Sequence, residues 1–504
     1  MCTVARIGAI VSGVNTSGAY TSGENTNGVS ITTGDKSHPE ERVAALRPVM
    51  GFRDLLLFYI VTGFSVRWIA QAAHGGPSAL VIWVACAITF YVPLVACVLQ
   101  LSSRYPGEGG IYVWSQKAFG PFAGYMTAWT YWVSNLPYFP ALLGYTALNA
   151  LYLMGPGAQR LADSQTYFVV AALTGLGLAV WPNILGLRIG KWLHNAGAIG
   201  LWAPTIVLIV LGLAVGSRFG SATPITTRSL IPSTHLQDMI FWSTIAFSLS
   251  GLEAASIMGD EIHDARRNIP RALLLAGGII TVIYLLSTLA VMEAIPAQRV
   301  SVVQGIMNAV TSAAGRLGVP GIAFLVAACI TVGGIGQAGA WFAAAARLPF
   351  VAGIDSYLPA AFGRVHPRWN SPYVALIVQA IIAAGFIFLS LLGTNNYGAY
   401  DVLVATSVLF YFIPYLFMFG AMIRLRGSIV LGLMGLATTA LAIVLSFVPT
   451  ENNPNAWLFE LKVAGSTVIM LLAGAALYFL SSHRRKSGNV AGLAVNTLSQ
   501  RAER

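Results

Sequence analysis

The chain has 504 residues, of which 56% are hydrophobic and only 9% are charged, and its net charge is +11. Ordinary soluble proteins contain about 25% charged residues, so this composition excludes a soluble domain and predicts an all-α integral membrane protein. The positive charge does not predict a nucleic-acid partner, because Lys and Arg form short clusters between apolar runs, where membrane-protein loops carry them.

Residues 1–45 are rich in Gly, Ser, Thr and Asn and contain no apolar core. We therefore expect a disordered cytoplasmic tail there and no cleavable signal peptide. A helix that crosses a bilayer needs roughly 20 apolar residues, and residues 46–481 hold about twelve such stretches. Residues 482–504 are polar and basic and are expected to form a second disordered cytoplasmic tail. The expected helices span 54–74, 79–101, 121–154, 166–183, 194–216, 238–260, 271–292, 321–346, 373–393, 401–424, 428–448 and 459–481.

The positions of Lys and Arg predict which side of the membrane each loop faces. Twenty-two of the 29 lie in segments that face inward if the N-terminus is cytoplasmic, and six lie on the outer side. The remaining one, Arg67, falls inside the first helix. Cytoplasmic segments carry the excess of Lys and Arg. We therefore expect a multi-pass protein of the cell membrane with both termini, and the loops 102–120, 261–271 and 347–372, on the cytoplasmic side.

An even number of helices with both ends inside suits a transporter built from two five-helix units, followed here by two extra helices. Because five is odd, the second unit is inverted relative to the first. Such repeats place the substrate site at mid-membrane, between broken helices in corresponding positions, which here are the first and the sixth. Each of these helices contains a cluster of small, hydroxyl-bearing residues around a glycine. The predicted substrate-binding residues are Thr62, Gly63, Phe64, Ser65, Phe247, Ser248, Ser250 and Gly251.

Unwinding at these clusters would free backbone N–H and C=O groups, which a polar substrate can satisfy. The N-terminus of one half-helix favours a carboxylate and the C-terminus of the other favours an ammonium group, as a zwitterionic amino acid requires. The alternative is that small residues only let the helices pack closely. We favour the breaks, because both clusters occur where the repeat predicts them.

Three motifs occur in order along the chain. The first follows the second helix and contains Arg104, Pro106, Gly107 and Glu108, and the others combine residues 247–253 with 266–271 and 347–350 with 365–368. Together they resemble the amino acid–polyamine–organocation permease superfamily. The resemblance implies a LeuT-type fold and transport of amino acids or polyamines by alternating access. Residues 192–215 lack the lysine that some proton-coupled relatives carry, so proton coupling and exchange for a counter-substrate both stay open.

Three charged residues and one aromatic residue are candidates for coupling or gating. Glu253 is placed well inside a helix, where an acid costs about 2.5–3.5 kcal/mol. It is interpreted as a proton-sensitive switch or as a structural acceptor that stabilises the broken helix. Phe247 resembles an aromatic gate, or else is a core residue. Glu108 is expected at an inner gate, or else at the membrane edge. Arg67 is a charge partner for an acidic substrate or for Glu253, or else reaches water in an outer vestibule.

Trp129, Trp132 and Tyr138 of the third helix are assigned to the bundle core or to an interfacial aromatic belt. The seven histidines are dispersed, with no pair at metal-ligand spacing, so no metal, no cofactor and no enzymatic activity are expected. The leading hypothesis is a secondary amino-acid transporter in the lipid bilayer, with an amino acid or amine as substrate. The alternatives are a polyamine transporter and a membrane sensor that binds an amino acid without moving it.

Overall fold

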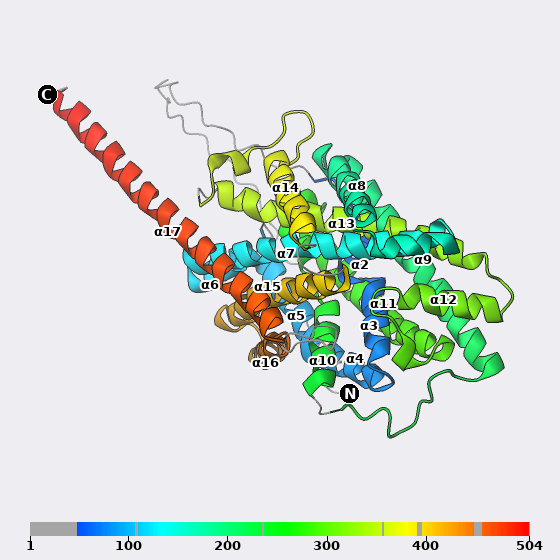
Figure 1. The fold of residues 1–504 in the computed structure, drawn as a ribbon. Coiled ribbons are helices and arrows are strands. Elements are labelled where there is room, and N and C mark those ends of the chain that lie inside the picture. Colours follow the sequence, from blue (N-terminus) through cyan, green and yellow to red (C-terminus); the bar gives the residue numbers. More distant parts are fainter. Residues whose placement is uncertain are drawn as a thin grey trace, which may run out of the picture. The chain divides into compact units, whose positions relative to one another are not determined.

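The computed structural model describes residues 48–105, 109–233, 236–354, 357–390, 396–447 and 456–502 and is built almost entirely of helices (Figure 1). The shorter helices are η1 (Ala87–Tyr91), η2 (Leu151–Leu153), η3 (Pro156–Asp163), η4 (Ala254–Glu261), η5 (Ala297–Arg299) and η6 (Ala360–Gly363). The α-helices are α2 (Phe52–Gly63), α3 (Val66–His74), α4 (Ser78–Cys86), α5 (Val92–Arg104), α6 (Ile111–Phe119), α7 (Pro121–Ala150), α8 (Gln165–Ile184), α9 (Leu187–Phe219), α10 (Leu236–Ser248), α11 (Ala265–Ala294), α12 (Gly305–Arg316), α13 (Ile322–Ile354), α14 (Tyr373–Ser390), α15 (Asn396–Arg424), α16 (Ile429–Leu445) and α17 (Ala456–Ala502).

Every predicted crossing coincides with helical structure, but the count of twelve crossings is not confirmed. Within the described residues, two shorter apolar helices cover 373–388 and 429–445. Eight helical segments are long and apolar enough to cross a membrane, and they are Phe52–His74, Ser78–Arg104, Gln165–Ile184, Leu187–Phe219, Ala265–Ala294, Ile322–Ala352, Tyr400–Arg424 and Phe459–Ser482.

The structure also contains helices that the sequence analysis did not predict. The short helices α6 and α12 lie in segments expected to be loops, and each directly precedes a long helix, α7 or α13. α17 continues as far as Ala502, beyond the predicted end of the last crossing at residue 481. The tail 1–45 lies outside the described residues.

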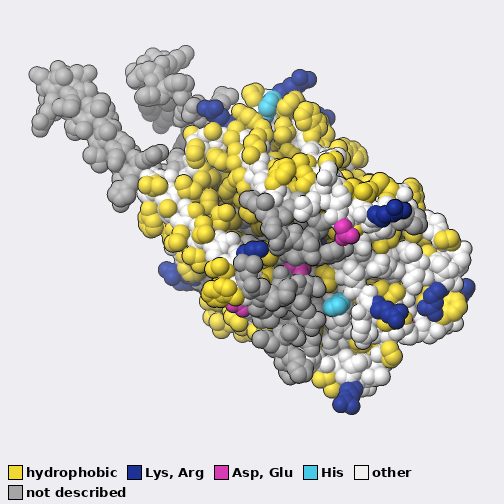
Figure 2. Space-filling view, viewed as in Figure 1, with side chains coloured by type: hydrophobic (Ala, Val, Ile, Leu, Met, Phe, Trp, Pro, Cys, Tyr) yellow, Lys and Arg dark blue, Asp and Glu magenta, His cyan; other side chains and the backbone are white. Residues whose placement is uncertain are grey.

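The described surface is rich in apolar side chains, as a lipid-facing surface must be. Trp192, Val430 and Ile381 are each more than half exposed, and Figure 2 shows hydrophobic side chains covering much of the face in view. Very few acidic side chains appear on that face. The chain is therefore a multi-pass membrane protein.

Glycines let α9 and α13 approach closely at the centre of the fold. A Cβ added to Gly197 would lie 2.7 Å from the Cα of Gly336, and one added to Gly200 would lie 2.7 Å from the backbone N of Gly333. Small residues permit this contact because they bring the helix backbones together. α13 also packs against α7, and α7 packs against α15 (Figure 1). The side chains of α13 next to Gly336 are thereby held in the middle of the bundle.

Candidate functional site

The first helix is interrupted at Phe64 and Ser65. α2 ends at Gly63, and the backbone is extended at Phe64 (φ −130°, ψ 137°) and at Ser65 (φ −146°, ψ 128°) before α3 begins at Val66. The break therefore lies within the cluster that the sequence analysis identified. The last C=O groups of α2 and the first N–H groups of α3 need partners from outside the helix.

The side chain of Gln337 on α13 supplies partners to this break. Its Nε2 donates to the carbonyl oxygens of Val61 (2.9 Å) and Phe64 (2.6 Å), and its Oε1 accepts from the hydroxyl of Ser65 (3.1 Å). The backbone N–H of Ser65 donates to the hydroxyl of Tyr284 (2.9 Å). The carbonyl groups of Val61 and Phe64 and the N–H of Ser65 are therefore satisfied by the protein itself in this conformation.

The sixth predicted helix is interrupted between α10, which ends at Ser248, and η4. Gly251 lies in this break with φ of +96°, which L side chains rarely adopt. The hydroxyls of Ser248 and Ser250 donate to backbone carbonyls three residues earlier, at 2.7 and 2.5 Å. A Cβ added to Gly251 would lie 2.6 Å from the carbonyl oxygen of Thr62, so the two breaks are in contact.

Glu253 stabilises this second break and is fully buried. Its Oε1 accepts from the hydroxyls of Tyr131 (2.8 Å) and Tyr411 (2.5 Å), and its Oε2 accepts from the hydroxyl of Tyr415 (2.6 Å) and from the N–H of Gly251 (3.1 Å). Each carboxylate oxygen therefore accepts two hydrogen bonds. Through these bonds Glu253 links the break to α7 and α15.

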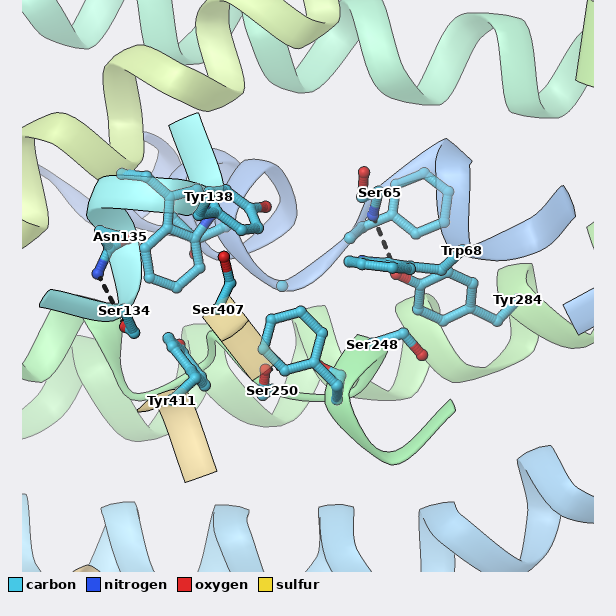
Figure 3. Close-up of a pocket in the computed structure, with 15 residues that line it drawn as sticks. Ser65, Trp68, Ser134, Asn135, Tyr138, Ser248, Ser250, Tyr284, Ser407 and Tyr411 are labelled. Atoms are coloured by element: carbon cyan, nitrogen blue, oxygen red, sulfur yellow. Dashed lines mark hydrogen bonds between the residues drawn. The ribbon is translucent and has the colours of Figure 1, made fainter. Parts of the chain in front are cut away.

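An enclosed cavity lies between the two breaks (Figure 3). Its volume is about 20 Å³, enough for one water molecule, so a solute the size of an amino acid requires side chains to move. Phe247 meets both Trp68 and Tyr411 edge to face, with ring centroids 5.3 Å apart in each pair. The lining residues are Thr62, Gly63, Phe64, Ser65, Trp68, Ser134, Asn135, Tyr138, Phe247, Ser248, Ser250, Tyr284, Trp341, Ser407 and Tyr411.

Seven of the eight predicted binding residues line this cavity. The eighth, Gly251, packs against Thr62, which is one of the lining residues. The sequence analysis missed the contributions of α7, α11, α13 and α15. The neighbouring polar residues Ser134 and Asn135, within a long apolar helix, were a usable signal. Tyr138, which was assigned to the core or to a belt, belongs to the buried core and also lines the cavity. Glu108 lies outside the described residues.

Comparison with known sequences identifies the family. The profile of the amino acid permease family matches residues 51–473. The chain belongs to the amino acid permease family. The permease is therefore a secondary transporter, and its substrates are small molecules.

Three curated relatives match between 60% and 84% of the chain. The permease is 28% identical to an uncharacterised transporter of Legionella pneumophila, over 84% of this chain and 95% of that protein. It is 26% identical to the probable agmatine/putrescine antiporter AguD of Lactococcus lactis, over 74% and 78% of the two chains. It is 29% identical to the low-affinity putrescine importer PlaP of Escherichia coli, over 60% and 66%.

The fold of the permease resembles that of MhsT, whose crystal structure contains L-phenylalanine. The TM-score is 0.56, with 13% sequence identity over 81% of this chain and 98% of MhsT. This similarity establishes the LeuT-type fold and no more, because the sequences differ too much for the ligand of MhsT to be assigned to this chain.

Arg67 lies next to the cavity without forming part of its wall. It is only 1% exposed, so the expected contact with water in an outer vestibule is absent. Its guanidinium carbon lies 4.2 Å from the ring centroid of Trp68 and 4.5 Å from that of Tyr138. The expected pairing with Glu253 is not found either, since tyrosines and Gly251 occupy both carboxylate oxygens.

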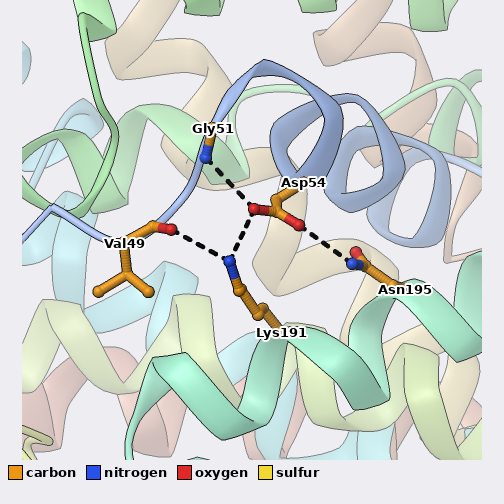
Figure 4. A network of polar contacts seen from close by, with 5 residues as sticks. All are labelled: Val49, Gly51, Asp54, Lys191 and Asn195. Carbon is orange, nitrogen blue, oxygen red and sulfur yellow. Dashed lines mark hydrogen bonds and ion pairs between the residues drawn. The ribbon is translucent and has the colours of Figure 1, made fainter.

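A second polar network joins the beginning of α2 to α9 (Figure 4). The Nζ of Lys191 lies 2.9 Å from a carboxylate oxygen of Asp54 and 3.3 Å from the carbonyl oxygen of Val49. The side chain of Asn195 and the N–H of Gly51 also donate to Asp54. The network therefore fastens the first half-helix to the fifth predicted helix at one end of the bundle.

Other contacts bring the predicted inner loops to that same end. Glu261 forms a buried, two-pronged ion pair with Arg347, with N–O distances of 2.7 and 2.8 Å. Glu261 also accepts from the backbone N–H groups of Val49 and Met50 through its carbonyl oxygen, and Ser371 donates to the carbonyl of Ile184. The loops that were predicted to share one side of the membrane are thus in contact with one another. Among the described residues, no cluster of three or more His, Cys, Asp or Glu side chains could hold a metal.

Proposed function

We propose that the permease carries an amino acid or a related small amine by alternating access, and that the cavity between the two helix breaks is the substrate site. The observation that carries this proposal is the meeting of both breaks at one enclosed cavity, with Gly251 packed against Thr62. Transporters of this construction bind their substrates between discontinuous helices near mid-membrane. The small volume of the cavity identifies this conformation as closed around the site.

We also propose that the Asp54–Lys191 network is the inner gate. It joins the start of α2 to α9, and both elements have to separate if the cavity is to open at that end. The pair is partly exposed, with 20% of each side chain accessible, so it contributes little to stability. A weak, solvent-accessible contact suits a gate that opens in every transport cycle.

The proposed site can be tested by filling the cavity. Ser407 lines it with a buried hydroxyl, so Ser407→Phe should abolish uptake of radiolabelled amino acids into proteoliposomes of the purified permease. Thr174 on α8 faces outward, and Thr174→Phe is the matched control that should transport normally. Normal uptake by Ser407→Phe would place the substrate elsewhere. Binding without uptake by the unmodified permease would favour the sensor alternative.

The proposed orientation places both termini, and the end with the Asp54 network, in the cytoplasm. It rests on the excess of Lys and Arg in the inner segments. Single cysteines at Ser103 and Arg368, both exposed, should resist an impermeant thiol reagent added to intact cells, while one at Gln298 should react. The background needs Cys2, Cys86, Cys97 and Cys329 replaced. The opposite labelling pattern would invert the topology.

A further inference from the structure

Arg67 is a buried cation beside the hydroxyls of Tyr138 and Tyr400. Its Nε and both of its Nη atoms nevertheless make no hydrogen bond of good geometry with the part of the chain that the structure describes. A charge removed from water is destabilising unless it is paired and hydrogen-bonded. A guanidinium has five N–H donors that match a carboxylate in two parallel bonds. The guanidinium of Arg67 therefore has no hydrogen-bonded anion in this conformation, among the described residues.

The position of Arg67 makes the cavity the natural source of that anion. Trp68 and Tyr138, whose rings cover the guanidinium, are both part of the cavity wall. α3 also begins at the cavity, and its N-cap residue Ser65 makes no side-chain capping hydrogen bond. The positive end of that helix therefore faces the same region as Arg67.

The cavity itself favours an anionic group over a second cation. All fifteen lining residues are neutral, so a diamine would find no carboxylate there. Aromatic rings can bind cations, but two of the faces, on Trp68 and Tyr138, are already occupied by Arg67. Among the lining side chains that are described, the one buried polar atom without a partner is the indole nitrogen of Trp341, which is a donor.

An acidic residue of the protein is the rival partner. Asp401 follows Tyr400 on α15, and the Tyr400 hydroxyl lies within the field of both Arg67 and Asp401. The Arg67 nitrogens make no hydrogen bond with Asp401 in this conformation. The experiment therefore has to distinguish recognition of a substrate carboxylate from an ion pair between Arg67 and Asp401 that forms in another conformation.

We infer that Arg67 recognises the carboxylate of the transported solute, so that the permease accepts amino acids and discriminates against their decarboxylated amines. This inference rests on the proposed function and names the substrate class of the same site. Trp68 and Tyr138 have to swing away from the guanidinium when the cavity expands around the substrate. The substrate carboxylate then takes their place and forms charge-assisted hydrogen bonds with Arg67.

The test compares solutes that differ only in the α-carboxylate: leucine with isoamylamine, ornithine with putrescine, and arginine with agmatine. In proteoliposomes, excess unlabelled carboxylate-bearing members should compete with a transported amino acid at least about tenfold better than their amines. Arg67→Gln should reduce this discrimination to within about twofold, mainly by weakening the amino acids, and Arg67→Lys should restore part of it because it keeps the charge. Arg316→Gln, at an exposed arginine on α12, is the control that should leave the discrimination unchanged.

Thermal unfolding separates recognition from a structural role. Because the printed contacts of Arg67 are with aromatic rings and phenol hydroxyls, Arg67→Gln should lower the Tm only slightly, whereas loss of an internal ion pair would lower it strongly and weaken all solutes equally. Equal or better competition by the amines in the unmodified permease would overturn the inference and leave transport standing. Ligand-induced Tm shifts by amino acids alone, without any uptake, would keep the inference and overturn the proposed transport. The same loss of discrimination in Asp401→Asn as in Arg67→Gln would assign Arg67 to an internal ion pair and overturn the inference.

Discussion

The two helix breaks satisfy their backbone by different chemistry. At the first break a neutral amide, Gln337, donates to two carbonyl groups and accepts from one hydroxyl. At the second break a carboxylate, Glu253, collects three phenol hydroxyls and one backbone N–H. An amide has the same hydrogen-bonding capacity at any ordinary pH, whereas a carboxylate loses an acceptor when it is protonated. We therefore predict that the second break responds to protons and that the first does not.

The largest loss of transport is expected from a substitution at Gly251, where the two helix breaks are in contact. Gly251→Ala forces a side chain into a backbone conformation with φ of +96° and places its Cβ 2.6 Å from the carbonyl oxygen of Thr62. The conformational strain alone is about 1–2 kcal/mol, and the clash adds to it. Transport and the closed conformation should both be lost. Gly278→Ala on α11, where a Cβ would meet nothing within 4 Å, is the control. Near-normal uptake by Gly251→Ala would mean that the breaks separate freely.

The next largest loss of uptake is expected from replacing the carboxylate of the second break, a group that the first break lacks. Glu253→Gln keeps an acceptor oxygen but removes the negative charge that three phenols and the Gly251 N–H surround. We expect uptake to fall by about tenfold, equivalent to about 1.4 kcal/mol, and to lose most of its pH dependence while substrate binding persists. Uptake and binding measured between pH 5 and 8 test these expectations, and an unchanged pH profile in the variant would leave Glu253 a purely structural role.

At the neutral break, a loss of stability that does not depend on pH is expected. Gln337→Leu leaves the carbonyl groups of Val61 and Phe64 without their donor, at about 1–3 kcal/mol for each buried group left unsatisfied. Part of this loss is recovered if water enters the break. The Tm of the detergent-purified protein should fall, and the pH profile of uptake should keep its shape. A changed pH profile would contradict the assignment of this break as insensitive to protons.

The smallest loss of uptake is expected from removing a single hydrogen-bond donor to Glu253. Tyr131→Phe removes one of the two phenol hydroxyls on Oε1 and leaves Tyr411 in place. The expected loss is about 1 kcal/mol, the typical net contribution of one hydrogen bond. Uptake should fall only severalfold. Tyr284→Phe, which removes the acceptor of the Ser65 N–H at the other break, is the matching variant there. A larger effect on pH dependence in Tyr284→Phe than in Tyr131→Phe would reverse the comparison.

Composition and local sequence determined the membrane class of the chain, the approximate position of each long helix, and the places of both breaks. These properties follow from short-range physics: apolar runs of bilayer length form helices, and clusters of Gly, Ser and Thr allow them to unwind. The short helices α6 and α12 were missed because they lack the length that identifies a crossing helix.

Only the tertiary structure decided which side chains complete the site. Gln337 lies more than 270 residues from the break that it satisfies, and Tyr411 and Tyr415 lie about 160 residues from Glu253. Packing of α13 against α9, and of α15 against α7, brings these residues together, and no local pattern records such distances. The isolation of Arg67 is likewise a property of the folded interior. A sequence shows that an arginine is present in a helix, but the surrounding helices decide whether water or a partner can reach it.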